Sequence, residues 1–522
     1  MVKSDFVDAL SDPTRALLDF YHPGADIDAF PASVAAHFAH IFASNDAFSE
    51  IPSIYTVDPR QNDRRLVSFR AMIQDTSPSP EMYLAKRSGA RCGGWGLADD
   101  ATSDDGLDYA DLRENTVVWA VSVPGESDWV SSEIDATDTP GFTRLPESHP
   151  FKFPVSGAPH LGVQVKIYDT SRTDLLKSTD IVTLVGILTM EIMTSESESP
   201  NAIAVPTLHV LFSRPIPLTV VPRVFPYSPS ASTCETLRDQ LISWIADEGL
   251  AGDEEAAEWV LLNTIAKVQS RTPPLLPLSL TLSKFPPPPA SKSSTPRLSA
   301  VLSHLLPIVV TLPLSLEVLN NSSFSPESKN EDLHSGRLQL PRGSVCVVTE
   351  GGVTEGGVFD RGLRNLRALQ EVMSSQSLEY IFPFSRFAFE TDIAFLILSE
   401  GRKSAFFQTN VNVQLKPNEA GELYGSIKEP SPETLAMFRD FVGGAKIGNV
   451  TIGENVAEYI QEDFVAERKA AATPAGAVTS DDLIHRMMVA RLLTISLHKT
   501  EVTTDIWERT KAMEAARRAR LT

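Results

Sequence analysis

The chain has 522 residues, of which 42% are hydrophobic and 22% are charged, an ordinary composition for a folded protein. This length exceeds what one hydrophobic core supports and indicates about three or four domains. The formal net charge of −21 disfavours nucleic acid as the main partner, because phosphate binding needs clustered Lys and Arg. It suits basic, DNA-handling proteins as partners.

No membrane span and no secretion signal are expected. The longest apolar stretch, around residues 305–319, is interrupted by prolines and is shorter than the ~18–20 residues of a membrane-spanning helix. The first residues, MVKSDFVDALSD, carry acids and lack the apolar segment of a signal peptide. We therefore expect a soluble intracellular protein.

The reactive residue types form no catalytic or metal-binding pattern. Cys92, Cys234 and Cys346 are far apart and offer neither a disulfide framework nor a CxxC pair. His37 and His40 lie one helical turn apart and allow a metal pair, but no third or fourth ligand lies nearby, which favours a structural role. We expect no catalytic residues, no metal and no cofactor.

Two regions with different periodicity make up the first part of the chain. Residues 1–63 carry apolar side chains at helical spacing, with prolines as boundaries, and are expected to be helical. Residues 64–222 alternate as half-buried strands do, and short strands with long loops favour an OB-like β-barrel. Two surface loops are expected within it, an acidic insert at 96–115 and a Ser/Glu run at 194–200 that is either simply solvated or phosphorylated. The expected strands are RLVSFRAMIQD, TVVWAVSVPG, LGVQVKIYD, DIVTLVGILTME and TLHVLFSR, with MYLAKRS as a possible further one.

A proline-rich linker at 223–235 separates this barrel from a different pattern. Over residues 236–416 strands alternate with helices, which predicts an α/β domain with a mostly parallel sheet. Within it, GRLQLPRGSVCVVTE is expected to form two strands around a Pro-Arg-Gly turn, and ETDIAFLILSEG a buried strand. Residues 430–522 are expected to be helical. The fold class predicted is therefore multidomain α/β.

A set of longer segments carries a more specific pattern. In chain order they are SFRAMIQD with EMYLA, VSVPGESDWV, VKIYD with DIVTLVGIL, GRLQLPRGS, LSEGR, EDFVAERK with DDLIHRMMVARLLTISL, and TTDIWERTKAMEAARRARL. In this order they resemble the motifs of the MCM-binding protein family, and of its fungal members in particular. Members of that family bind subunits of the mini-chromosome maintenance (MCM) replicative helicase.

The resemblance implies a non-catalytic nuclear protein that acts in DNA replication. Its expected partners are MCM helicase subunits and subcomplexes, with chromatin contacted only through MCM and without strong direct binding to nucleic acid. The implied activities are chaperoning of MCM subcomplexes, promotion of MCM disassembly from chromatin, and a role in sister-chromatid cohesion. Alone, the protein is expected to be a monomer.

From Leu237 to Met513 the order of elements also resembles the AAA+ module of an MCM subunit, which implies a degenerate AAA+-like domain with a C-terminal helical lid. In such a module a Gly-rich loop with a Lys cradles the phosphates of the nucleotide. The corresponding loop here, KFPPPPASKSST, keeps Lys292 and Ser293. It has no glycine, and its four prolines remove backbone donors. We expect it not to bind phosphate.

The same resemblance places further departures in the nucleotide site. Thr349 and Glu350 stand where a Walker B strand ends in two acids, which hold Mg²⁺ and polarise water. Glu400 aligns with a water-sensing Asn, Gln408 with the arginine finger and Asp481 with a phosphate-sensing Arg. Together these positions predict a vestigial nucleotide site.

Two other functions stay open at this stage. One is an ATPase with an atypical pocket. The other is a single-stranded-DNA-binding replication factor, because a small cluster of arginines with one aromatic ring lies at the start of the barrel, offset by the acidic insert. The residues of that cluster are Arg64, Arg65, Phe69 and Arg70.

The last residues admit two explanations. Arg517, Arg518 and Arg520 fit a nuclear import signal. They fit equally well the cationic last turn of a helix, where positive charge complements the helix dipole.

Overall fold

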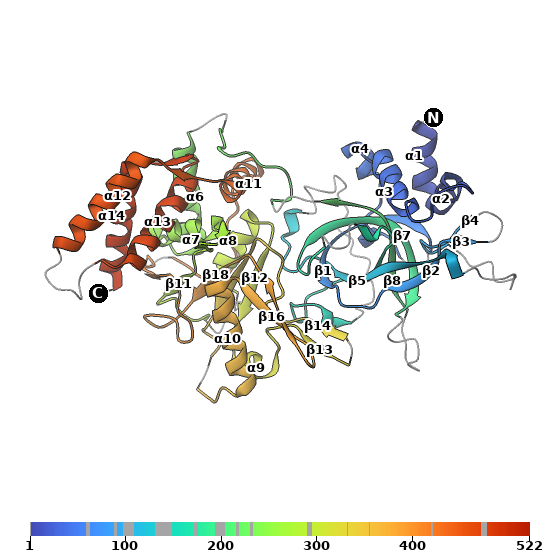
Figure 1. Cartoon of the computed structure of the whole chain (residues 1–522). Coiled ribbons are helices and arrows are strands. Elements are labelled where there is room, and N and C mark those ends of the chain that lie inside the picture. The colour runs from blue at the N-terminus through green and yellow to red at the C-terminus, as the bar shows by residue number, and fades with distance from the viewer. Residues whose placement is uncertain are drawn as a thin grey trace.

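The computed structural model describes residues 2–58, 63–87, 91–97, 109–130, 149–171, 176–193, 204–215, 219–229, 233–289, 295–330, 332–353, 355–418, 421–470 and 478–521. A β-barrel with N-terminal helices lies beside an α/β domain, and the last helices of the chain, from Glu454 onward, lie at the far end of that domain (Figure 1). The fold is therefore multidomain α/β, as expected. Lys292 and Ser293, the Ser/Glu run and most of the acidic insert lie outside the described residues.

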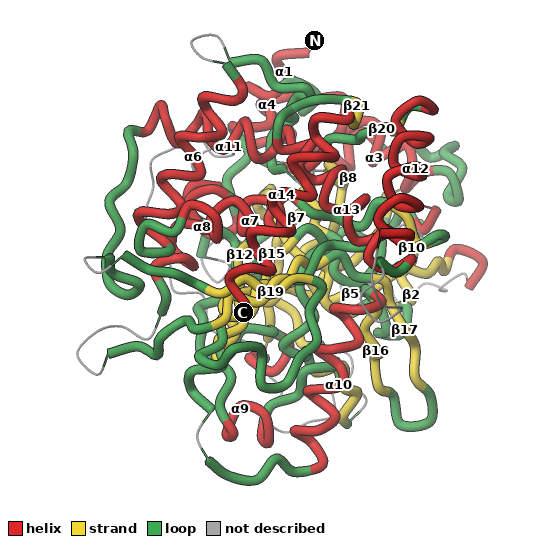
Figure 2. The backbone as a smooth tube through the Cα atoms, turned by 90° about the vertical axis from the view of Figure 1, so that its left-hand side faces the viewer, coloured by secondary structure: helices red, strands yellow, loops and turns green. Residues whose placement is uncertain are grey.

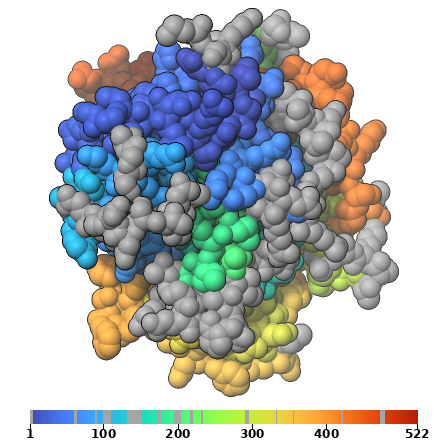
Figure 3. Space-filling model, turned by 90° about the vertical axis from the view of Figure 1, so that its right-hand side faces the viewer, coloured from blue at the N-terminus to red at the C-terminus, as the bar shows by residue number. Residues whose placement is uncertain are grey.

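Short helices begin the chain, as predicted. Asp12 starts the second of them by accepting the Arg15 N–H at 3.0 Å, and the following Pro13 has the backbone angle that a first helical turn needs. His37 stacks on Phe20 with ring centroids 4.1 Å apart, a packing role. The helices cover one side of the barrel (Figure 3). They are α1 (Val2–Ser11), α2 (Pro13–Phe20), α3 (Phe30–Ile41), α4 (Asn45–Ser49) and the 3₁₀ turn η1 (Ile54–Thr56).

Five strands close into a barrel in the order β1-β7-β8-β6-β5, because β1 pairs with both β7 and β5. Every pair in this ring is antiparallel except β6 with β8, which is parallel. A further strand, β2, extends the sheet beside β5. The ring strands are β1 (Arg65–Asp75), β5 (Leu112–Val121), β6 (Gly162–Ile167), β7 (Ile181–Ile192) and β8 (Ala204–Pro215). The shorter elements are β2 (Glu81–Leu84), β3 (Lys86–Arg87), β4 (Arg91–Cys92), η2 (Tyr109–Asp111) and η3 (Pro150–Lys152).

The α/β domain is built on five parallel strands in the order β12-β15-β18-β11-β19. Their apolar side chains alternate between two cores: Val345 and Val347 face one side of β15, Cys346 and Val348 the other. Burial on both faces explains why these strands read as continuous apolar runs. The strands are β11 (Leu280–Ser283), β12 (Val309–Pro313), β15 (Ser344–Thr349), β18 (Ile393–Leu398) and β19 (Val411–Gln414). The helices that cover them include α6 (Cys234–Gly249), α7 (Glu254–Ile265), α8 (Arg297–Leu305), α9 (Leu316–Asn321) and α10 (Asp360–Ser375).

A smaller sheet, β14-β13-β16-β17, lies beside the parallel one. Its β16–β17 hairpin extends beside α10, with Phe384 fully exposed in the turn (Figure 2). The strands are β13 (Glu327–Lys329), β14 (Asp332–His334), β16 (Ser377–Ile381) and β17 (Arg386–Glu390); a separate pair is β9 (Ser270–Arg271) with β10 (Pro274–Leu275).

One expectation is wrong in this region, since residues 337–340 form no strand. The Leu338 N–H donates to the Phe324 carbonyl at 3.0 Å, and the Gln339 N–H to the Gly336 carbonyl at 2.9 Å. These bonds hold an irregular segment whose apolar side chains still pack into the core. Alternation of apolar residues therefore did not distinguish a strand from a buried loop.

In the described part of residues 430–522 the chain forms four helices, and the helical character is as predicted. The apolar stripe of α13, which ends in Leu493, and the following Leu497 pack into the domain core. The arginines of the last turn are ion-paired: Arg517 with Glu514, Arg518 with Asp482, and Arg520 with Asp253 and Glu255. The elements are α11 (Pro432–Ile447), α12 (Glu454–Ala470), α13 (Ser480–Ser496) and α14 (Thr504–Leu521), with a small parallel pair β20 (Thr451–Ile452) and β21 (Glu501–Val502).

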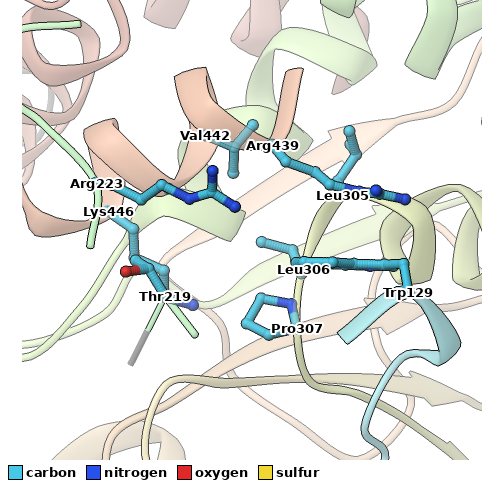
Figure 4. Close-up of a pocket in the computed structure, with 10 residues that line it drawn as sticks. Trp129, Thr219, Arg223, Leu305, Leu306, Pro307, Arg439, Val442 and Lys446 are labelled. Carbon is cyan, nitrogen blue, oxygen red and sulfur yellow. The ribbon is translucent and has the colours of Figure 1, made fainter. Parts of the chain in front are cut away.

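The barrel and the α/β domain are joined by a close backbone contact. The Val309 N–H donates to the Gly125 carbonyl at 2.9 Å, and the Ser127 N–H to the Pro307 carbonyl at 2.9 Å. Gly125 has a positive φ of 71°, and a Cβ there would lie 2.4 Å from Val310, so this approach requires glycine. Beside it, the Arg439 guanidinium lies over the Trp129 ring at 4.3 Å (Figure 4).

Candidate functional site

The candidate site lies at the carboxyl ends of the parallel strands, where open α/β sheets bind their ligands. The first strand of the sheet, β11, is flanked by β18 and β19. The loop after β11 therefore lies next to the segment after β18, and this is the place where a phosphate-binding loop would meet the other nucleotide-site residues.

The loop after β11 is held by the segment after β18. The Lys284 N–H donates to the Gly401 carbonyl at 2.8 Å, and the Phe285 N–H to the Ser399 carbonyl at 2.9 Å. The four prolines that follow, residues 286–289, have no N–H to offer a phosphate. Among the described loop residues, the backbone donors that precede the prolines are thus used within the protein.

A second segment of the chain covers the start of α8. The Arg297 N–H, at the first helical position, donates to the Leu423 carbonyl at 2.9 Å, and Pro296 forms a β-bridge with Tyr424. The Tyr424 hydroxyl donates to the Pro286 carbonyl at 2.8 Å, which joins the same segment to the proline loop. Helix N-termini bind phosphate through such free N–H groups. Here residues 423–424 occupy that position.

Thr349 is the last residue of β15 and Glu350 follows it directly, and the two serve different purposes. Glu350 is buried, and its two carboxylate oxygens accept the Ser404 hydroxyl at 2.5 Å and the Ala405 N–H at 3.1 Å. The Thr349 carbonyl accepts the Leu314 N–H at 2.9 Å. The Glu350 carboxylate is thus a structural acceptor that holds the segment after β18 against β15.

Glu400 lies at the centre of the candidate site. A Cβ added to Gly351 would lie 2.9 Å from the Glu400 carboxylate and 3.8 Å from Pro288, so the ends of β11, β15 and β18 meet here. Burial, with the Glu400 charge as a smaller cause, raises the pKa of Tyr424 to about 12. An exposed carboxylate at this point repels a phosphate chain.

Gln408 and Asp481 lie outside this meeting point. Gln408 is exposed between β18 and β19, and its backbone exchanges two hydrogen bonds with the Gln370 side chain of α10, at 2.8 and 3.1 Å. Asp481 is exposed in the first turn of α13, which is capped by Thr479 and Asp482. The contacts of the described residues therefore bring Glu350, Glu400 and the proline loop together, but add neither of these two.

The segment that contains Leu423 and Tyr424 and covers the start of α8 was not predicted from the sequence. Residues 417–429 fell between the two predicted C-terminal regions, and Leu423 and Tyr424 are its buried apolar side chains. An apolar pair inside a polar stretch was the available signal. Its contact with α8 spans more than a hundred positions and has no periodicity to reveal it.

The arginine cluster of the barrel does not form a base-stacking surface. Phe69 is fully buried in the barrel core, so its ring is not accessible to bases. Arg70 pairs with Glu126 at 2.6 Å, and the Arg64 Nε donates to the Gly96 carbonyl at 3.0 Å. The single-stranded-DNA hypothesis is therefore wrong in one part: Phe69 cannot stack on bases.

Among the described residues, His, Cys, Asp and Glu form no group of three or more that fits a metal ion. Burial raises the pKa of the Cys346 thiol to about 12 and of the Cys92 thiol to about 11, so both are poor nucleophiles. In the same part of the chain, each helix is too short or too polar to cross a membrane.

Comparison with known proteins identifies a matching family model and several similar proteins. A family model described as mini-chromosome maintenance replisome factor matches residues 142–521. The whole chain is 25% identical to the mini-chromosome maintenance complex-binding protein of Arabidopsis thaliana and covers 97% of it. The protein of that name from Gallus gallus is 24% identical over 98% of both chains, and the one from Homo sapiens 27% identical over 74% of this chain and 66% of the human one.

Proposed function

Because this chain belongs to the mini-chromosome maintenance replisome factor family, we propose that it is a non-catalytic binding protein for MCM helicase subunits and subcomplexes. Relatives that match nearly the whole chain are named for binding the MCM complex. The partner class follows from these names and from the acidic character of the chain, which favours basic DNA-handling proteins.

The proposed architecture has five consecutive segments. Residues 1–63 are an N-terminal helical region, residues 64–222 an OB-like barrel and residues 223–235 a linker. Residues 236–416 are a degenerate AAA+-like domain, and residues 430–522 its helical lid with a basic tail. The closed five-strand ring supports the barrel assignment, and the parallel sheet with its first strand inside supports the AAA+-like one.

One observation carries the non-catalytic assignment: residues 423–424 occupy the start of α8. The Arg297 N–H is bonded to Leu423, and Tyr424 is bonded to the proline loop. A phosphate would have to displace this segment and then lie against the Glu400 carboxylate. The vestigial positions Thr349, Gln408 and Asp481 offer no cation in compensation. Calorimetric titration with Mg²⁺–ATP tests this, and micromolar binding would establish the alternative, an ATPase with an atypical pocket.

The partner assignment is tested by affinity capture from a nuclear extract. The tagged protein is incubated with the extract, and bound proteins are identified by mass spectrometry. MCM subunits are expected among them and are expected to survive nuclease treatment, because chromatin is contacted only through MCM. A capture without MCM subunits rejects the assignment. Nuclease-sensitive capture instead favours the single-stranded-DNA alternative, whose binding falls steeply with salt.

The remaining parts of the proposal concern the location of the protein in the cell, its roles there and its oligomeric state. We place the protein in the nucleus, as a chaperone of MCM subcomplexes and a promoter of their disassembly from chromatin, with a role in sister-chromatid cohesion. Alone it is a monomer, because ring protomers are coupled by nucleotide at their junction and this chain offers none. Light scattering that gives a hexamer contradicts the last point. Fungal origin, expected from the sequence motifs, remains a prediction.

A further inference from the structure

A groove of about 340 Å³ opens between the barrel and the smaller sheet of the α/β domain, on the side opposite the lid. One wall is the loop around η3, with Phe151 and Pro154, and the other carries Lys329, Arg337 and Arg361. Its lining includes Lys329 of β13 and His334 of β14, two strands that Figure 1 labels. Its volume is in the range of ligand-binding clefts. Nothing in the proposed function uses it.

Two of its cations share one carboxylate. The Lys329 ammonium lies 3.1 Å from the Glu327 carboxylate, and the Arg361 guanidinium lies 3.4 Å from the same oxygen. The other nearby acid, Asp332, forms an ion pair with the buried Lys152. The carboxylates around the groove are thus already engaged, and a positive charge remains in a chain whose net charge is −21.

Arg337 adds a further positive charge to the groove. It is partly buried, and within the part of the chain that the structure describes no carboxylate pairs with its guanidinium. Its backbone N–H donates to the Ser323 carbonyl at 3.0 Å, and the Ser323 hydroxyl accepts from Arg361 at 3.3 Å, so the two guanidinium-bearing residues lie on either side of one serine. Partial burial of a guanidinium without an anion is costly and favours an external one.

The aromatic rings of the groove are already engaged. Phe151 stacks on His334 with centroids 4.2 Å apart, and Phe153 on His160 at 4.4 Å. Burial lowers the pKa of His334; the positive charges of Lys329 and Lys152 lower it further, whereas the negative charges of Asp332 and Glu327 raise it. The rings therefore form an apolar rim beside the cations.

We propose that this groove binds a phosphoryl group carried by a phosphorylated serine or threonine of another protein. Two guanidinium groups and an ammonium suit a phosphate dianion better than a single carboxylate, because planar guanidinium groups bind phosphate oxygens in pairs. The apolar rim accommodates the neighbouring side chains of an extended peptide. Gly157, where an added Cβ would meet nothing within 4 Å, lies at its open side.

Nucleic acid fits this groove less well than a phosphopeptide does. Base stacking needs accessible aromatic faces and a basic track several nucleotides long. Here both phenylalanines are stacked on histidines, and Lys329 and Arg361 share one carboxylate oxygen of Glu327 rather than forming a track. A single phosphoryl group matches this arrangement, whereas a polyanion would extend past it over an acidic chain.

The test uses the purified full chain and immobilised peptides in which a fixed phosphoserine is flanked by random residues. Matched resins carry serine or glutamate at that position, and another carries single-stranded oligothymidylate. The variants are Arg337→Gln and, as the matched control, Arg367→Gln, which removes an exposed arginine of α10 outside the groove. No MCM subunit is present, so the result is independent of the proposed function.

The phosphoserine resin is expected to retain the protein at least ~10-fold more strongly than the serine resin, which corresponds to the added charge-assisted hydrogen bonds. Arg337→Gln is expected to abolish most of this difference and Arg367→Gln to preserve it, while both variants melt like the parent chain. Equal retention on phosphoserine and serine resins overturns the proposal. So does an equal effect of the two substitutions, or stronger, Arg337-dependent retention on oligothymidylate.

Discussion

The Gln339 side-chain amide donates to the Gln74 backbone carbonyl at 2.7 Å, across the junction between the α/β domain and the barrel. Gln339 is fully buried, and the same amide also lies within hydrogen-bonding distance of the Ser178 and Tyr380 hydroxyls. Its oxygen accepts from the Gln74 side chain at 3.2 Å. One glutamine therefore satisfies polar groups from both domains, which fixes their relative position.

Gln339→Ala is expected to destabilise the protein by about 3 kcal/mol, because several buried donors and acceptors lose their partner at once. The change is measured as the shift of the thermal or urea unfolding midpoint. Gln461→Ala, at an exposed position of α12, is the matched control and should cost at most about 0.5 kcal/mol. Equal effects of the two substitutions would show that the network does not join the domains.

The end of α14 is expected to contribute to stability through Arg520. Its guanidinium lies 2.7 Å from the Asp253 carboxylate, which is almost fully buried and caps α7. Arg520→Ala leaves this carboxylate without its cation and should cost about 3 kcal/mol in unfolding free energy. The control is Arg518→Ala, because Arg518 is half exposed and an exposed ion pair contributes less than about 1 kcal/mol.

The Arg518→Ala variant also separates the two explanations of the C-terminal arginines. If the cluster is only a structural helix end, Arg518→Ala leaves nuclear accumulation unchanged. If it is an import signal, Arg518→Ala lowers accumulation although the protein stays folded. Fluorescence microscopy of tagged variants measures the outcome, with melting temperatures as the check on folding.

Acid sensitivity is expected to come partly from His498. Its Nδ1 accepts the Tyr227 N–H at 3.0 Å, and its Nε2 lies 3.0 Å from the Phe441 carbonyl, so only a neutral ring satisfies both contacts. Burial lowers the pKa of His498 from 6.5 to about 4. Between these values the unfolded chain binds a proton that the folded chain does not, so stability falls as the pH decreases.

Between pH 6.5 and pH 4.5 this histidine should remove about 2–3 kcal/mol of stability. Glu191 and Glu514, whose pKa values are lowered from 4.5 to about 2, lose their contributions only at lower pH, which leaves this window to histidine. Urea unfolding at several pH values measures the slope. His498→Gln should flatten it, and His40→Gln, at an exposed position, should leave it unchanged. An unchanged slope in the first variant contradicts the assignment.

Sequence patterns predicted those parts of the fold that depend on local periodicity. Short continuous apolar runs marked β15 and β18, because neighbouring side chains such as Cys346 and Val347 are buried in opposite cores. The helical stripe of α13 was recognisable for the same reason. Periodicity failed for residues 337–340, where buried leucines are held by loop hydrogen bonds.

Contacts between distant segments could not be predicted in this way. Gln74 and Gln339 are both polar residues in apolar surroundings, and only the closed barrel brings them together. Leu423 and Tyr424 cover the start of α8 for a similar reason, since no repeat or motif links them to the proline loop. Loss of glycines and cations predicted a vestigial nucleotide site, which stays a prediction, whereas the contact of residues 423–424 with the start of α8 became visible only in the structure.

The AAA+-like half is expected to bind a free MCM subunit at a surface that overlaps a ring interface of the helicase. A degenerate protomer keeps the shape of its interfaces while losing catalytic side chains, because shape comes from the packed core. Such a copy would occupy one side of a subunit and exclude the true neighbour. True neighbours bind ATP at their junction, and we expect that this chain does not, because residues 423–424 contact the start of α8. ATP should therefore favour the neighbour.

Competition measures this directly. A complex of this protein with one MCM subunit is challenged with the ring neighbours of that subunit, with and without ATP, and the species are separated by size-exclusion chromatography. Release of the protein is expected, and ATP should increase it, whereas an MCM subunit that is not a neighbour should release little. If the protein stays on closed hexamers with no subunit displaced and no effect of ATP, the overlapping interface is wrong, although binding to MCM itself would stand. Because the neighbour and this chain compete for one surface, release should also grow with neighbour concentration, as simple exclusion requires.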